Sequence, residues 1–195
     1  MLMALAREGD GAGEVTPGAT HASLAQAAAQ GLENLRPRWV MEGGAVATHP
    51  TGWMVTATRA TDALVLESAP AISGAFRVEA SLVIFANDPK FAGQADIVLG
   101  DVGGDRLLLA INTREGVYLF RRAAPGDPYE LLADVNQFKV APFSEIAVQV
   151  DYDGEVLHAQ VGEVKLPPVR LADRLLDGAA GFGAHAGSTV FYKRF

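Results

Sequence analysis

Short apolar runs separated by turn residues dominate the chain from Trp39 to its end. Runs rich in Val, Ile, Leu, Phe and Tyr alternate with clusters of Gly, Pro, Asp and Asn. Regular short strands with this punctuation are typical of an antiparallel β-sandwich or barrel, so the sequence predicts an all-β fold. Strands are expected near residues 38–41, 44–49, 52–58, 62–67, 75–86, 94–101, 105–113, 117–122, 129–134, 144–152, 155–161, 163–166, 179–185 and 188–195.

The dipeptide Asp153-Gly154 predicts a hairpin with a two-residue tip. Folding there makes one face of the hairpin wholly apolar and the other mostly polar, so Val148, Val150, Leu157 and Val161 are expected in the core. The expected pairs are Val150 with Leu157, Val148 with Ala159 and Ile146 with Val161 on the apolar face, and Asp151 with Val156, Gln149 with His158 and Ala147 with Gln160 on the polar face.

Two further hairpins can be placed in register. A tip at Gly103-Gly104 sets Asp101 opposite Arg106 and leaves both faces apolar, which predicts central strands covered on both sides. A loop through Arg114-Glu115-Gly116 forms the other hairpin. The expected pairs are Leu99 with Leu108 and Val98 with Leu109 in the first, and Asn112 with Tyr118, Ala110 with Phe120 and Ile111 with Leu119 in the second.

The N-terminal part differs from the rest. Residues 1–19 have the composition of a flexible tail, and the stripe Leu24, Ala28, Leu32 and Leu35 predicts a short helix over residues 20–35. The predicted division is therefore 1–36 for tail and helix and 37–195 for the β-domain. Inside the β-domain, Val169 to Leu176 is expected to form a turn of helix. No signal peptide or membrane-spanning stretch is recognised, which favours a cytoplasmic protein by default.

Composition narrows the class of protein. The 195 residues suit one domain with a short appendage, and a 49% hydrophobic content provides a core. The absence of cysteine excludes disulfides, thiolate zinc sites and a cysteine nucleophile. Sixteen basic residues against 23 acidic ones give a net charge of −7, which argues against nucleic acid as a partner.

Several blocks of this pattern resemble the concanavalin A-like lectin/glucanase jelly rolls, and most closely their laminin-G-like and 3-keto-disaccharide-hydrolase-like domains. The resemblance covers roughly residues 39–195. It implies two packed antiparallel sheets, one of them concave, with carbohydrate often bound on the concave face or at its rim, and it would suit an exported protein. The blocks are 76–80, 95–101, 107–112, 116–121, 146–150, 153–154, 157–161, 178–183 and 190–192.

The catalytic signature of the hydrolases in that superfamily is missing. They carry Glu-x-Asp-x-x-Glu or a close variant on one strand, whereas Glu79 is alone on its strand. Asp96 and Asp101 are an odd number of positions apart, so they are expected on opposite faces. The sequence therefore predicts no catalytic residues, and an enzyme is the less favoured interpretation.

Metal sites are not predicted either. His21, His49, His158 and His185 are scattered without ligand spacing, and His185 is interpreted as structural. Calcium is the one cofactor left open, because Asp88, Asp101, Asp105 and Asp127 lie in expected loops or turns. Turn formation is the favoured role for each of these four carboxylates.

Sugar binding calls for an aromatic face and planar polar groups on open strand positions. Asn112 with Tyr118 meets this description, and so does Gln149 with His158. These four residues are the predicted ligand-binding residues, and Trp53 and Tyr129 are candidates on the rims. Whether the two pairs share one groove is left open.

The sequence thus favours a non-catalytic binding module for carbohydrate. Two alternatives remain. One is a structural or assembly protein that uses the jelly roll as a scaffold and the N-terminal helix for oligomerisation. The other is an enzyme acting on a glycoside through a non-standard site.

Overall fold

The computed structural model describes residues 39–59, 62–67, 74–86, 90, 92–141, 143–171 and 178–195. All secondary-structure elements in these ranges are β-strands. Val40–Phe195 form one compact unit. The tail and helix expected before residue 37 lie outside the described residues. The strands are β1 (Trp39–Glu42), β2 (Ala45–His49), β3 (Gly52–Thr56), β4 (Ala63–Glu67), β5 (Phe76–Ala86), β6 (Gln94–Val102), β7 (Asp105–Asn112), β8 (Gly116–Arg122), β9 (Glu130–Asn136), β10 (Ile146–Tyr152), β11 (Val156–Val161), β12 (Val164–Lys165), β13 (Val169–Arg170), β14 (Gly181–Ala184) and β15 (Ser188–Arg194).

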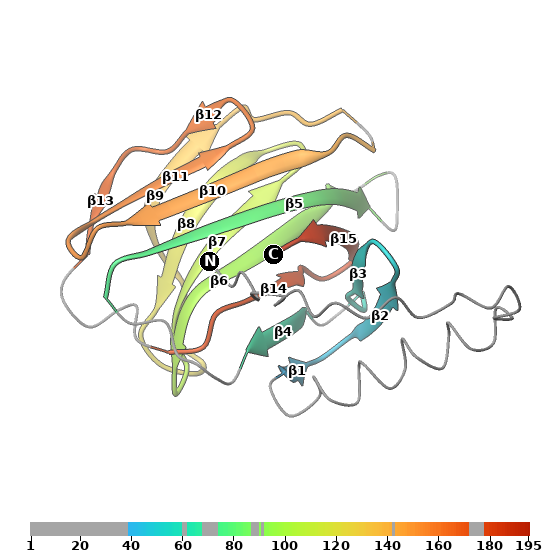
Figure 1. The fold of residues 1–195 in the computed structure, drawn as a ribbon, viewed down its shortest axis with the longest axis horizontal. Coiled ribbons are helices and arrows are strands. Elements are labelled where there is room, and N and C mark those ends of the chain that lie inside the picture. Colours follow the sequence, from blue (N-terminus) through green and yellow to red (C-terminus); the bar gives the residue numbers. More distant parts are fainter. Residues whose placement is uncertain are drawn as a thin grey trace, which may run out of the picture. The chain divides into compact units, whose positions relative to one another are not determined.

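The strands form two antiparallel sheets. The seven-stranded sheet has the order β1-β4-β14-β6-β7-β8-β9. The eight-stranded sheet has the order β12-β11-β10-β5-β15-β3-β2, with β13 also paired to β11. Figure 1 shows them as two layers, with β5 and β10 lying over β7 and β8. The all-β sandwich expected from the sequence is therefore present.

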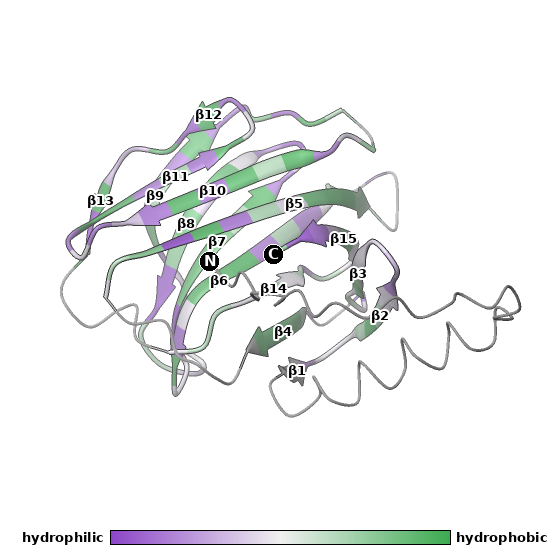
Figure 2. Ribbon diagram, in the orientation of Figure 1, coloured by the Kyte–Doolittle hydropathy of each residue, from purple (hydrophilic) through white to green (hydrophobic). Residues whose placement is uncertain are grey.

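Alternation along the strands separates core from surface. On β10, Ile146, Val148 and Val150 are buried, whereas Ala147 and Gln149 are exposed. Their neighbours Leu157, Ala159 and Val161 on β11 are buried as well, so the predicted core face is confirmed. In Figure 2, β10 changes between green and purple along its length, as a strand covered on one side should.

Tyr192 ties the two layers together. It lies on β15 of the eight-stranded sheet, is fully buried, and packs on Phe182 of β14 with ring centroids 4.6 Å apart. Its single hydroxyl hydrogen is shared between the carbonyl oxygens of Gly183 at 2.6 Å and Asp96 at 3.0 Å. A phenol that reaches across a dry core needs such partners, so Tyr192 fixes how β15 packs beneath β14 and β6.

The registers expected for two hairpins are wrong by two residues, although the faces are right. The structure pairs Val150 with Ala159, because Asp153 accepts backbone hydrogen bonds from Glu155 and Val156 and moves the tip to Gly154-Glu155. In the other hairpin the observed pairs are Asn112 with Gly116 and Ala110 with Tyr118. A shift of two residues leaves every side chain on its expected face.

The third hairpin contains a β-bulge that the sequence did not reveal. Asp101 pairs with Arg106 as expected, but Leu99 is an extra residue, so Val98 pairs with Leu108 instead of Leu109. The bulge changes the alternation along β6. Asp96 and Asp101 therefore lie on the same face of the sheet, and the expectation that they face opposite sides is wrong.

The helical turn expected over 169–176 is wrong at its start. Val169–Arg170 forms strand β13 against β11, and residues 172–176 lie outside the described residues. Pairing of Leu157 with Val169 buries the edge of β11, and this tertiary contact outweighs local helix propensity. Within the described ranges, no helix is long and apolar enough to cross a membrane.

Candidate functional site

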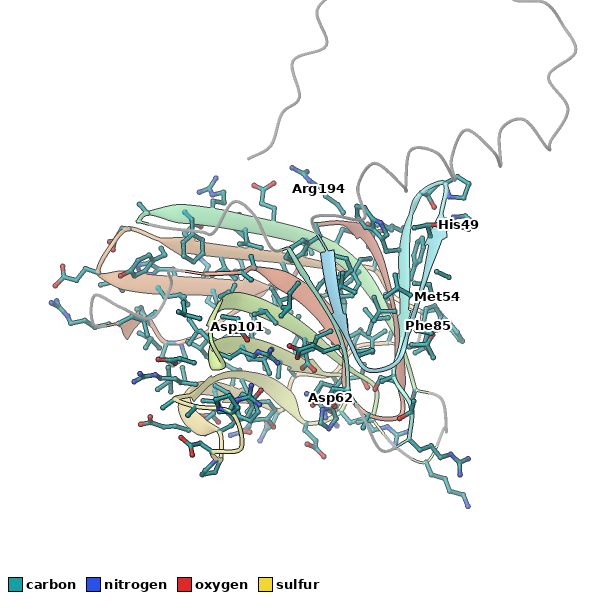
Figure 3. All side chains as sticks on the ribbon, turned by 90° about the horizontal axis from the view of Figure 1, so that it is seen from below. His49, Met54, Asp62, Phe85, Asp101 and Arg194 are labelled. Carbon is teal, nitrogen blue, oxygen red and sulfur yellow. The ribbon has the colours of Figure 1, made fainter. Side chains whose placement is uncertain are left out.

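The two predicted residue pairs lie on different sheets. Asn112 and Tyr118 belong to β7 and β8 of the seven-stranded sheet, and Gln149 and His158 to β10 and β11 of the eight-stranded sheet. Both pairs are on the outer faces, because the residues that alternate with them are in the core between the sheets. The labelled side chains Asp62 and Arg194 mark these two opposite sides in Figure 3. The four residues therefore cannot line one groove.

An aromatic cluster occupies the outer face at β8 and β9. We define it as Tyr118, Phe120 and Tyr129. Tyr118 and Phe120 stack with ring centroids 5.7 Å apart, and Tyr129 meets Phe120 edge-on at 6.1 Å. The guanidinium of Arg122 lies 5.3 Å from the centre of the Tyr129 ring. All three rings are partly exposed, so the cluster offers an apolar surface to solvent.

Polar side chains from β9 border the aromatic cluster. Asp134 is directly opposite Tyr118, and Asn136 is opposite Gly116. The Tyr118 hydroxyl donates to Asn136 Oδ1 at 3.3 Å, and the Asn136 amide donates to Asp134. Partial burial, together with the carboxylates of Glu115 and Asp134, raises the pKa of Tyr118, so its hydroxyl is protonated at neutral pH. This edge combines an aromatic surface with a phenol, an amide and a carboxylate.

Asn112 has a structural role in its loop. Its Oδ1 accepts hydrogen bonds from the backbone N–H groups of Arg114 at 3.0 Å and Glu115 at 3.1 Å. The side chain is buried and its Nδ2 faces a carboxylate oxygen of Glu115 at 3.4 Å. These bonds close the loop one residue earlier than expected, and they occupy the amide that was predicted to contact ligand.

The opposite outer face carries a hollow of about 240 Å³ with a mixed polar and apolar lining, to which Gln149 contributes. Its other polar lining residues include Glu79, Ser81, Gln160 and Arg194. Arg194 donates to Glu79 at 2.8 Å, and Gln149 donates to Asp151 at 2.6 Å, a bond that lowers the pKa of Asp151. His158 is exposed and pairs with Asp151 instead of Gln149. Among the residues that the structure describes, no aromatic side chain lines this hollow.

The remaining candidates have other partners or positions. Asp101 binds Arg106, Asp105 binds Arg121, and Asp127 lies in an exposed turn, whereas Asp88 lies outside the described residues. Trp53 was expected on a rim, but its ring packs 5.8 Å from Phe182 of the facing sheet. Tyr129 is exposed beside β8, and belongs to the aromatic cluster.

Sequence reasoning missed Phe120, Asp134 and Asn136. Alternation along β8 places Phe120 on the face of Tyr118, and this signal was available. The contribution of β9 was harder to see. Leu119 pairs with Ala133 and Phe120 with Leu131, so Leu132 is an extra residue in β9. This bulge sets which side chains of β9 share the face with Tyr118.

Comparisons with known proteins agree on the architecture. No protein-family model matches the sequence, and no curated protein sequence matches it significantly. Among solved structures, the carbohydrate binding module CBM66 from Bacillus subtilis is similar with a TM-score of 0.64 and 14% identity, over 78% of this chain and 91% of that one. The carbohydrate recognition domain of Emp46p gives 0.61 and 14%, over 80% and 86%.

A protein of unknown function with a galectin-like fold from Bacillus subtilis gives a TM-score of 0.61 at 13% identity, over 82% of this chain and 88% of that one. Structural similarity at identities this low establishes the fold only, so the function has to be argued from the site. The chain has the concanavalin A-like jelly-roll fold that its strand pattern resembles.

Proposed function

We propose that the protein is a non-catalytic carbohydrate-binding module whose ligand contacts the aromatic cluster on the outer face of the seven-stranded sheet. The observation that carries this proposal is the stacked pair Tyr118 and Phe120 bordered by Asp134 and Asn136. The C–H groups of a pyranose ring pack against aromatic surface, and its hydroxyls need planar polar partners. Both requirements are met within two neighbouring strands.

The similar structures support this class of ligand. Two of them are a carbohydrate binding module and a carbohydrate recognition domain by name. The hollow on the opposite face is the weaker candidate, because Gln149 and Arg194 already bond to carboxylates and no aromatic ring among the described residues lines it. Tyr118 is retained from the sequence-based prediction, whereas Asn112 is replaced by Asn136.

The test starts with the full chain on a broad glycan array, followed by calorimetric titration of the strongest ligand. Tyr118→Ala is expected to weaken binding by about 10- to 100-fold, which corresponds to roughly 1–3 kcal/mol. Gln149→Ala on the opposite face is the matched control and is expected to bind as the wild type does. Thermal unfolding of both variants checks that the domain remains folded.

Each other outcome identifies a competing interpretation. Loss of binding in Gln149→Ala with none in Tyr118→Ala moves the site to the hollow on the eight-stranded sheet. Absence of any glycan ligand favours the scaffold role, which sedimentation of the full chain and of residues 37–195 then examines. Hydrolysis of a bound glycoside would overturn the non-catalytic assignment.

A further inference from the structure

Three potential ligand groups meet around β14, on the same outer face. They are Asp62, Asp96 and His185, and one side-chain donor atom from each lies within 4.8 Å of the other two. β14 lies between β4 and β6, with Ala184 paired to Ala63 on one side and Gly183 paired to Asp96 on the other. Asp62 and His185 flank that first pair, so three distant segments converge here.

Asp96 is the unusual member of this cluster. Its side chain is 1% exposed, and it accepts a hydrogen bond from the Gln94 amide at 2.9 Å. Its second oxygen accepts no hydrogen bond from any residue that the structure describes. Burial raises the pKa of Asp96 to about 6, which shows how poorly this position solvates a carboxylate. Gln94 thus occupies one oxygen of this nearly buried side chain, and the other has no described hydrogen-bond donor, although no described side-chain N or O atom that is fully enclosed lacks a partner.

The neighbouring cation is already engaged. Arg106 donates to Asp101 at 2.5 Å and to Glu42 at 3.0 Å, so its guanidinium contacts those two carboxylates. His185 Nδ1 lies 2.9 Å from Asp62 Oδ1, and the same oxygen accepts the backbone N–H of Ala186 at 2.9 Å. Asp62 therefore has its other oxygen left for a ligand, and no described cationic side chain contacts Asp96.

We propose that Asp62, Asp96 and His185 bind a divalent transition-metal cation of the Zn²⁺ class. One imidazole nitrogen and two carboxylate oxygens form a mixed donor set that suits Zn²⁺, with water completing a four-coordinate shell. Ca²⁺ and Mg²⁺ prefer six or more oxygen donors, and the histidine counts against them. The two carboxylates neutralise a divalent ion, which removes the cost of burying Asp96 as an anion.

Asp62 and His185 are the accessible members, with side-chain exposures of 47% and 50%. An ion can therefore reach the cluster from solvent, whereas Asp96 forms its buried floor. Coordination through His185 requires a neutral imidazole, so binding is expected to release protons and to weaken at acidic pH. The hydrogen bond between His185 and Asp62 would be exchanged for metal–ligand bonds.

The experiment uses the full chain after dialysis against EDTA. ZnCl₂ is titrated calorimetrically in 150 mM NaCl, an ionic strength at which weak surface binding of cations is largely screened. Asp96→Asn and His185→Gln are the test variants. His158→Gln is the matched control, because it removes an exposed histidine from the opposite sheet.

Wild type and His158→Gln are expected to bind one Zn²⁺ per chain, with a rise in the melting temperature. Both test variants are expected to bind about 10- to 100-fold more weakly. Circular dichroism confirms that each variant is folded. Failure of the wild type to bind Zn²⁺ would overturn the proposal, and so would binding by His185→Gln and Asp96→Asn that is as tight as that of the wild type. The cluster would then be an ion pair beside a buried acid. Tighter binding of Ca²⁺ than of Zn²⁺ would overturn the assigned class.

Discussion

Asp96 and Tyr118 stand in one cross-strand row on the outer face of the seven-stranded sheet, with Ala110 between them. Asp96 pairs with Ala110 across β6 and β7, and Ala110 pairs with Tyr118 across β7 and β8. Two strand spacings separate their backbones by about 10 Å. The proposed cation site and the proposed saccharide site therefore share one surface, and each can be removed by a substitution that leaves the other intact.

Asp96→Asn is expected to change how stability depends on pH in metal-free protein. The pKa of Asp96 is about 6 in the folded state and near 3.8 when unfolded, so the folded state binds more protons between these values. Wild-type stability should consequently fall as pH rises from about 4 to about 6, and the variant should lack this fall.

At pH 8 in EDTA the same variant should be more stable than wild type by about 1–3 kcal/mol, the upper figure corresponding to about two pKa units. Below pH 4 the two proteins should converge. Urea unfolding at several pH values measures this difference. A constant offset at all pH values would show that burial does not penalise the Asp96 carboxylate.

Val150→Asp is expected to destabilise the domain by at least about 3 kcal/mol, because it places a carboxylate without a partner between the sheets. Val150 is fully buried, whereas Ala147 on the same strand is exposed. Ala147→Asp is therefore the matched control and should cost less than about 1 kcal/mol. Equal urea midpoints for the two variants would contradict the assignment of faces on β10.

Tyr192→Phe isolates the hydroxyl that joins the layers. Removing it leaves the carbonyls of Asp96 and Gly183 without this donor, at a cost of about 1–3 kcal/mol. Tyr118→Phe removes a hydroxyl that bonds to the exposed Asn136, and should have little effect on stability. Thermal melts of the two variants provide the comparison, and equal melting temperatures would argue against a bridging role for Tyr192.

Arg106→Met tests the ion pairs beside the proposed cation site. The side chains of Arg106 and Asp101 are 5% and 11% exposed, so the substitution leaves a nearly buried carboxylate without its partner. The free energy of unfolding should fall by about 3–5 kcal/mol. Arg77→Met breaks the exposed pair with Asp151 and should hardly alter the urea midpoint, because solvent screens that contact. A similar small change for both variants would show that Asp101 is readily resolvated.

Much of the fold could be predicted because alternation is a local property. The strands and the core face of β10 and β11 follow from residues close together in sequence, so Val148, Val150, Leu157 and Val161 were placed correctly. The register was lost where a side chain redirected a turn. The carboxylate of Asp153 and the amide of Asn112 each accept two backbone hydrogen bonds, and each moved a hairpin tip by one position.

The site was less predictable because it depends on which strands become neighbours. Tyr118 and Gln149 satisfy the same local pattern, yet their strands belong to different sheets, and only long-range pairing decides this. Asp62, Asp96 and His185 come from three separate parts of the sequence. No spacing rule detects them, because β14 must first insert between β4 and β6.

The bulge at Leu99 has a consequence for tracing the ancestry of this domain. One additional residue in β6 reverses the face on which every later side chain of the strand lies. Asp101 therefore shares a face with Asp96 despite the odd spacing. In a relative that lacks that residue, the counterpart of Asp101 would stand four positions after Asp96, and an acid five positions after Asp96 would face the core. Homologous positions in β6 should accordingly be equated by their partners on β7, such as Arg106, and not by counting along the strand.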